Sequence, residues 1–242
     1  MNFNIETYLN SLSEDIQKIN VSDKDINYLP DLRRFKKLKI LNCNNNKLTS
    51  LPHFNEKLEK IYCCHNQLSS LPLLNENLKE LYCSHNQLTS LPQFNKKLEQ
   101  LNCSNNQITS LPHFNEKLEK IYCSYNQLSF LPHLNKKLKI LYCRNNKLNS
   151  LPYFNEELED LYYDDNPIWK IIKNDNLSIL KIKIQLLNNF CYLYYCLKFK
   201  KKFRDLLWVK IREPKIKERY SHDYLVKHLH EDTDLDEFLN NW

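Results

Sequence analysis

The chain has 242 residues, of which 42% are hydrophobic, 12% aromatic and 26% charged, and its formal net charge is +6. A chain of this length and hydrophobic content can bury a sizeable core, which excludes a disordered protein. Glycine is absent, where an average chain of this length would carry roughly 17. We therefore expect no glycine-rich phosphate-binding loop, and turns that use asparagine in place of glycine.

Residues 1–15 are predicted to form an amphipathic capping helix. Ile5, Tyr8, Leu9 and Leu12 share one face of such a helix, and that face can cover the open end of a stack of repeats. The segment carries acidic residues and lacks a continuous apolar run, so it does not have the pattern of a secretory signal.

Residues 16–176 contain an internal repeat with a period of 20 residues. A degenerate first unit begins at Ile16, and its loop, residues 31–37, is two residues longer than the others. Seven further units each begin with a leucine: Leu38, Leu58, Leu78, Leu98, Leu118, Leu138 and Leu158. Below, the units are numbered 1 to 8 in chain order.

The units follow the pattern LxxLxCxxNxLxxLPxFNxx, which resembles the leucine-rich-repeat signature with cysteine at the third apolar position. The resemblance implies an α/β-type solenoid: a right-handed parallel β array of eight short repeats of 20–22 residues. In unit 4 the alternation of a strand places Leu81 and Cys83 inside and Tyr82 outside. Units this short, with a proline in the second half, favour extended convex segments over helices.

The LP-containing unit is also similar to the short repeats of secreted bacterial effectors, whose convex segment has the pattern LPxLP where this chain has LPxFN. This likeness extends to the class of repeat and not to the activity of those effectors. Some of them place a catalytic cysteine after the repeats. Here Cys191 and Cys196 lie among Tyr, Leu and Phe, so we interpret both as buried on a helix face, without ligase activity.

Two columns of identical residues are expected inside the solenoid. One consists of asparagines whose amides can satisfy backbone groups where each strand ends: Asn46, Asn66, Asn86, Asn106, Asn126, Asn146 and Asn166. The other, continued by Tyr163, consists of cysteines acting as small buried hydrophobes: Cys43, Cys63, Cys83, Cys103, Cys123 and Cys143.

Metal or redox chemistry is the alternative interpretation of the cysteines, because Cys63 and Cys83 are each followed two places on by histidine. No CxxC pair occurs, and the histidine lies where the strand turns, away from the inward thiol. The sequence also lacks GxSxG and HExxH motifs. We therefore expect neither an enzyme nor a bound metal or cofactor.

The outward strand positions form the candidate binding face, on the concave side. Tyrosine offers contact area and a hydrogen-bonding tip at low entropic cost, which suits protein recognition. The alternative is that stacked tyrosines only brace a solvated sheet. The predicted binding residues are Tyr62, Tyr82, Tyr122, Tyr142 and Tyr162, with His65, His85 and Tyr125 three residues further along their units.

Residues 177–242 are expected to be a helical region, with helical periodicity from about Leu177 to Val209. Residues 169–212 hold eleven Lys and Arg against two acids, and the last 30 residues hold four against eight. The basic run 198–204 admits binding to nucleic acid or an acidic membrane surface, but such a run is more often a solvated helix face. We do not expect nucleic acid as the partner, nor a membrane-spanning segment, because the longest apolar stretch is too short.

The ending of the chain resembles a C-terminal segment of proteins from giant amoeba-infecting DNA viruses of the mimivirus type. The resemblance rests on Trp208, residues 212–216, Tyr220, Tyr224-Leu225 and residues 234–242. It implies a viral origin, and thus the cytoplasm of a host cell, where a host protein is one candidate partner of the concave face; no role for the segment itself follows. The sequence thus predicts a monomeric, non-enzymatic protein-binding module; the alternative is an adaptor whose C-terminal helices recruit cellular machinery such as a ubiquitin ligase.

Overall fold

A computed structural model describes residues 3–172 and 176–207. The chain separates into two compact parts, residues 1–186 and 187–242. In chain order the elements are α1 (Ile5–Asn10), β1 (Lys18–Asn20), β2 (Ile40–Asn42), β3 (Lys60–Tyr62), β4 (Glu80–Tyr82), β5 (Gln100–Asn102), β6 (Lys120–Tyr122), β7 (Ile140–Tyr142), β8 (Asp160–Tyr162), the 3-10 helix η1 (Pro167–Lys170) and α2 (Leu177–Leu207).

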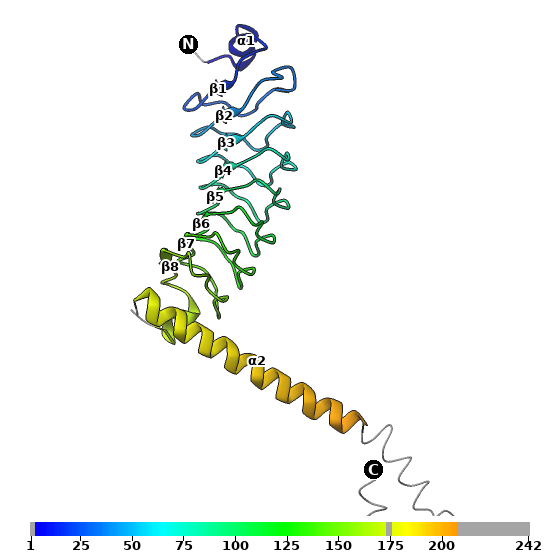
Figure 1. The fold of residues 1–242 in the computed structure, drawn as a ribbon. Helices are drawn as coiled ribbons and strands as arrows, with labels where there is room; N and C mark the ends of the chain where they lie inside the picture. The colour runs from blue at the N-terminus through cyan, green and yellow to red at the C-terminus, as the bar shows by residue number, and fades with distance from the viewer. Residues whose placement is uncertain (1–2, 173–175, 208–242) are drawn as a thin grey trace, which may run out of the picture. The chain divides into compact units, whose positions relative to one another are not determined.

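The eight strands form one parallel sheet in the order of the sequence, with one strand from each unit (Figure 1). From β2 to β8 each residue pairs with the residue 20 positions later, as Lys60 does with Glu80. Between β1 and β2 the offset is 22, as in the pairing of Lys18 with Ile40, because the loop of unit 1 is longer. The predicted leucine-rich-repeat array is confirmed.

The core consists of the inward-facing side chains of every unit. Leu81 and Cys83 are buried and Tyr82 is half-buried, as the alternation predicts. The second halves of units 2 to 7 run back without a helix among the described residues. They carry an unforeseen column of amides: Asn115, for example, donates from Nδ2 to the carbonyls of Asn95 and Leu98.

The predicted asparagine column is confirmed, and its bonds connect neighbouring units. Asn126 donates from Nδ2 to the carbonyl of Cys123 in its own unit and to that of Cys103 in the preceding unit, at 3.1 and 3.0 Å. Its Oδ1 accepts the backbone N–H of Ile108 at 3.0 Å. Each amide therefore satisfies buried backbone groups that no strand partner reaches.

The two ends of the sheet are covered. The helix α1 is shorter than predicted: it spans six residues, begins at the N-cap Asn4, and buries Ile5 and Leu9. At the other end Tyr163 extends the cysteine column, and its hydroxyl donates to the carbonyl of Ile172. Within the first compact part, α2 buries Leu180 and Ile184.

The remainder of α2 shows where the sequence analysis was wrong about Cys191. This thiol is exposed, not buried on a helix face. Periodicity indicates a helix, but it does not show that another segment packs against that helix. The nonpolar side chains of α2 are distributed around its whole circumference, so no single face is marked as the buried one. Cys196 lies outside the residues whose burial the structure describes. No helix within residues 3–172 and 176–207 is long and apolar enough to cross a lipid bilayer.

Candidate functional site

The outward side chains of β2 to β8, and those of the turns that follow these strands, form three rows on the concave face, each with one residue from each of units 2 to 8. The leading row occupies the first strand position: Ile40, Lys60, Glu80, Gln100, Lys120, Ile140 and Asp160. The tyrosine row lies two residues on: Asn42, Tyr62, Tyr82, Asn102, Tyr122, Tyr142 and Tyr162. The turn row follows after three more: Asn45, His65, His85, Asn105, Tyr125, Asn145 and Asp165.

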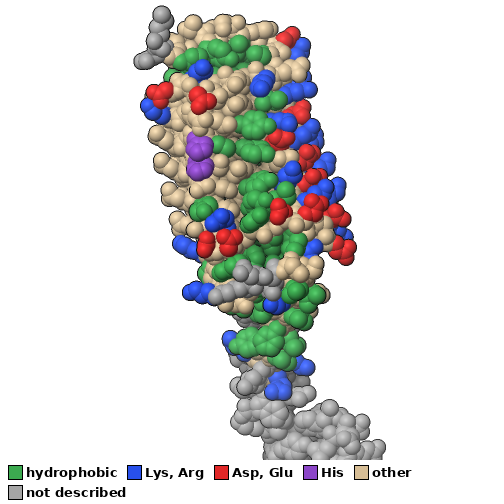
Figure 2. All heavy atoms as spheres, turned by 90° about the vertical axis from the view of Figure 1, so that its left-hand side faces the viewer, with side chains coloured by type: hydrophobic (Ala, Val, Ile, Leu, Met, Phe, Trp, Pro, Cys, Tyr) green, Lys and Arg blue, Asp and Glu red, His purple; other side chains and the backbone are tan. Residues whose placement is uncertain are grey.

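The tyrosine row is aromatic in two blocks separated by Asn102. In the first block the rings of Tyr62 and Tyr82 are 5.2 Å apart between centroids. In the second, Tyr142 makes edge contacts with Tyr122 at 5.0 Å and with Tyr162 at 4.5 Å. Figure 2 shows this face, with a column of hydrophobic side chains beside a small histidine cluster. The structure thus brings the five predicted tyrosines together in two groups.

Three tyrosine hydroxyls are already bonded to the leading row of the next unit. Tyr62 donates to Glu80 at 2.8 Å, Tyr82 to the Oε1 atom of Gln100 at 2.8 Å, and Tyr142 to Asp160 at 2.9 Å. Burial and the Glu80 carboxylate raise the pKa of Tyr62, and the bond to Asp160 with burial raises that of Tyr142 to about 12. These three hydroxyl groups therefore have a hydrogen-bond partner within the protein.

The other two hydroxyls of the row lack a hydrogen bond from any described residue. Tyr162 belongs to the last strand and has no next unit, and its side chain is 48% exposed. The Tyr122 ring contacts Tyr142 of unit 7, and the leading row of that unit offers Ile140, which cannot accept a hydrogen bond. The five tyrosines are equivalent by their place in the repeat, and they differ only through the leading-row residue of the next unit.

The turn row has left-handed backbone in every unit. Asn45, Asn105 and Asn145 have φ of 52–57°, which asparagine tolerates well. His65 and His85 have φ of 55° and 54°, and their rings stack with centroids 4.1 Å apart. Burial and the neighbouring His65 lower the pKa of His85. The expectation that turns would do without glycine is confirmed, and the turn row is where they do so.

Tyr125 is the most strained member of the turn row. A bulky aromatic residue at φ 56° is uncommon, and the left-handed region costs an L-residue about 1–2 kcal/mol. The residue is 42% exposed, and its ring centroid lies 5.4 Å from the Arg144 guanidinium. Arg144 in turn lies 3.4 Å from Asp164 and 3.7 Å from Asp165. The ring is thus presented to solvent at a conformational cost.

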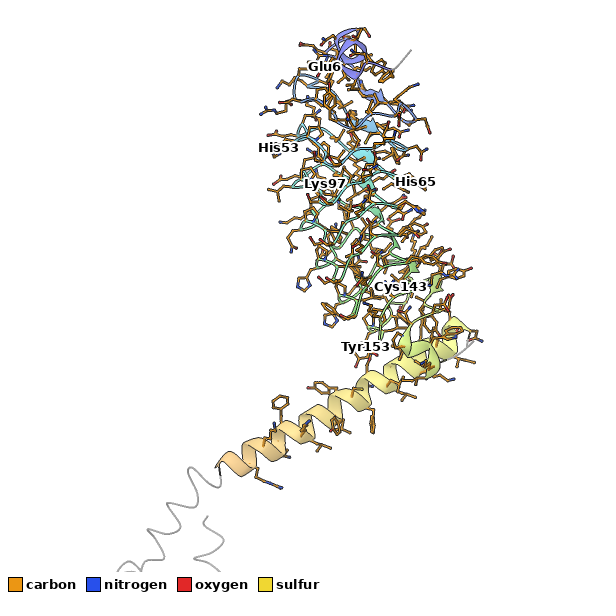
Figure 3. All side chains as sticks on the ribbon, turned by 180° about the vertical axis from the view of Figure 1, so that it is seen from behind. Glu6, His53, His65, Lys97, Cys143 and Tyr153 are labelled. Atoms are coloured by element: carbon orange, nitrogen blue, oxygen red, sulfur yellow. The ribbon has the colours of Figure 1, made fainter. Side chains whose placement is uncertain are left out.

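The cysteine column is sealed inside the solenoid. All six thiols are free and buried, and burial raises the pKa of Cys43 and Cys103 to about 12. Such thiols are poor nucleophiles and metal ligands at neutral pH. Among the described residues no group of three or more His, Cys, Asp or Glu is placed to hold a metal ion. In unit 3, His65 is exposed at the turn while Cys63 is buried in the core (Figure 3 labels His65 and, in unit 7, Cys143).

Comparisons with known proteins find leucine-rich repeats in both sequence and structure. A family model described as "Leucine Rich repeats (2 copies)" matches residues 76–116. A search of curated protein sequences finds no match. A leucine-rich-repeat protein of Leptospira interrogans is similar in structure, with a TM-score of 0.62 and 28% identity over 70% of this chain and 47% of that one.

Two bacterial effectors are also similar. The leucine-rich-repeat domain of a Shigella effector has a TM-score of 0.57 and 29% identity, covering 67% of this chain and 73% of that domain. YopM from Yersinia enterocolitica has a TM-score of 0.54 and 28% identity over 64% of this chain, which spans only 39% of YopM. The 20-residue repeat, the parallel sheet and these matches identify the solenoid of this chain as a leucine-rich-repeat array.

Proposed function

We propose that the chain is a non-enzymatic scaffold that binds a protein through its concave face. The observation that carries the proposal is the tyrosine row: aromatic rings in two blocks on a sheet face that no described segment covers. Aromatic side chains with polar neighbours are typical of the centres of protein interfaces. Leucine-rich-repeat proteins generally bind proteins, and the similar effectors belong to that class.

The bonded hydroxyls limit which residues make new hydrogen bonds. Tyr62, Tyr82 and Tyr142 offer ring surface, while Tyr122 and Tyr162 offer ring surface and a hydroxyl to which no described residue is bonded. The strained Tyr125 adds an exposed ring beside this second block. Binding therefore centres on units 6 to 8, with the stacked histidines of units 3 and 4 at the margin.

Site-specific photo-crosslinking tests the proposal. A benzophenone side chain replaces one tyrosine at a time: Tyr162 or Tyr122 on the concave face, or Tyr153 on the convex face (Figure 3 labels Tyr153). Tyr162 and Tyr153 are matched in exposure, at 48% and 46%. We expect the same partner to be crosslinked from Tyr162 and from Tyr122, identified by mass spectrometry in lysate of the source cells, and not from Tyr153. Equal crosslinking from the convex position would contradict binding through the concave face.

A second candidate function is the adaptor, in which α2 recruits cellular machinery such as a ubiquitin ligase. One observation favours it: Phe190, Leu193 and Leu197 are 69%, 55% and 58% exposed, at a spacing that places them on one face of the helix. Deletion should begin after residue 186, because Leu180 and Ile184 are buried in the solenoid part. If the chain is an adaptor, deletion of residues 187–242 leaves binding of the concave-face partner intact and abolishes binding of the cellular machinery. If it is a simple scaffold, the deletion changes no interaction.

A further inference from the structure

The concave face contains one pair of side chains that binds a carboxylate within the protein. In unit 3, Lys60 Nζ lies 2.6 Å from Oε1 of Glu80, and the Tyr62 hydroxyl donates to Oε2 of the same group at 2.8 Å. Lys60 and Tyr62 are the outer residues of β3, and Glu80 leads the next strand. A lysine and a tyrosine two residues apart therefore hold both oxygens of one carboxylate.

The same pair recurs in unit 6 with no internal carboxylate. β6 has the sequence Lys120-Ile121-Tyr122, identical to that of β3. The tyrosine row around it matches as well, since an asparagine precedes and a tyrosine follows in both places. The position of Glu80 is taken by Ile140, which pairs with Lys120 in the sheet.

Within the described part of the chain, this replacement leaves the Lys120 ammonium and the Tyr122 hydroxyl without an internal partner. Among residues 3–172 and 176–207, Lys120 Nζ has neither an ion-pair partner nor a hydrogen bond, and the Tyr122 hydroxyl has no acceptor. The other neighbour of Lys120 in the leading row is Gln100, which carries no charge. Both residues are half-buried, so their ammonium and hydroxyl groups lie at the surface of the concave face without an internal bond from the described residues.

We propose that Lys120 and Tyr122 form a carboxylate clamp that binds an aspartate or glutamate side chain of the protein partner. The inference rests on the proposed function, which it deepens by naming the chemistry of the contact. The partner's carboxylate takes the place that Glu80 fills in unit 3: one oxygen on the ammonium group, the other accepting the phenol. The strained ring of Tyr125 lies in the same unit and contacts the residues next to that carboxylate.

Synthetic peptide pools serve as the probe. All peptides are short and have an acetylated N-terminus, and their variable positions hold mixtures of neutral residues. Two pools have an amidated C-terminus: one has Glu at the central position and the other has Gln. A third pool has a free C-terminal carboxylate and no acidic side chain. On the immobilised full chain we expect the Glu pool to be retained about tenfold more strongly than the Gln pool, as charge-assisted hydrogen bonds allow. Preference for the third pool alone would overturn the assignment to a side chain.

The decisive variant supplies the missing carboxylate from within. Ile140→Glu should reduce the preference for the Glu pool to near unity, because the introduced group bonds to Lys120 and Tyr122 as Glu80 does in unit 3. Ile40→Glu is the matched control: it makes the same change in the leading row, beside Lys18 and Asn20, where no tyrosine completes a clamp. This control should keep the wild-type preference.

Lys120→Met is a second test that does not depend on whether Ile140→Glu folds. It should abolish the preference for the Glu pool over the Gln pool and leave the thermal unfolding temperature unchanged. Equal retention of the Glu and Gln pools by the wild type, or an undiminished preference in Ile140→Glu or Lys120→Met, refutes the clamp. These outcomes are separable from failure of the scaffold proposal. Concave-face crosslinks without a Glu preference contradict the clamp alone, and a Glu preference without such crosslinks contradicts the scaffold alone.

Discussion

Replacing Asn126 with alanine tests the asparagine column. The change leaves the buried N–H of Ile108 without an acceptor, which costs about 1–3 kcal/mol. The carbonyls of Cys103 and Cys123 each retain one amide donor, from Asn106 and Asn146 respectively, so each loses a bond worth about 0.5–1.5 kcal/mol without becoming unsatisfied. These terms together predict a loss of about 2–6 kcal/mol in the free energy of unfolding.

Double variants sharpen this prediction. Asn126 and Asn146 both donate to the Cys123 carbonyl, so removing both amides strips that carbonyl of two donors. The loss should then exceed the sum of the single losses by about 1 kcal/mol, as residues sharing a partner are coupled. Asn66 and Asn146 share no carbonyl, so that control pair should be additive.

Urea unfolding followed by circular dichroism gives these free energies, and hydrogen exchange of the Ile108 amide reports the orphaned group directly. Gln127→Ala removes an exposed amide next to Asn126 and should change stability by less than about 0.5 kcal/mol. A loss below about 1 kcal/mol for Asn126→Ala, or equal coupling in the two double variants, would refute the reasoning.

Two further predictions concern the turn row and alkaline pH. Tyr125→Asn should stabilise the protein by about 0.5 kcal/mol in thermal unfolding, because relief of left-handed strain exceeds the lost contact with arginine; a less stable variant would show that the contact dominates. Since the folded-state pKa of Tyr142 is raised from 10.0 to about 12 and that of Cys103 from 9.0 to about 12, both groups stabilise the fold fully below pH 9. That contribution is lost as the pH rises toward 12, so the urea midpoint should fall over this range, less steeply in Tyr142→Phe; a midpoint independent of pH is the contrary result.

The sequence predicted the fold well because the repeat carries its own alignment. Once the period of 20 is known, the alternation of Leu81, Tyr82 and Cys83 follows from strand geometry, and the asparagine column follows from its position after the strand. These features depend only on residues within one unit or at the same place in the next.

The candidate site was less predictable, because its chemistry depends on diagonal contacts. Tyr62, Tyr82 and Tyr142 each bond to the residue 18 positions later. In Tyr122 the residue at that distance is Ile140, which offers no acceptor. The turn row offered a signal that the sequence interpretation did not use: six of its seven residues are Asn, Asp or His, the non-glycine residues that most often adopt left-handed backbone. The exposure of Cys191 was not predictable from periodicity, because periodicity does not show which face of a helix packs against another segment.

The uniform 20-residue register has a genetic consequence. Recombination between similar units of the gene would remove or add whole units in frame, and the sheet would rejoin with every column still aligned. Loss of residues 138–157, for example, would place Asp160 beside Lys120, in the position that Ile140 occupies now. A single deletion event would thus supply the clamp with an internal carboxylate and change what the surface recognises, while the rejoined array kept its columns.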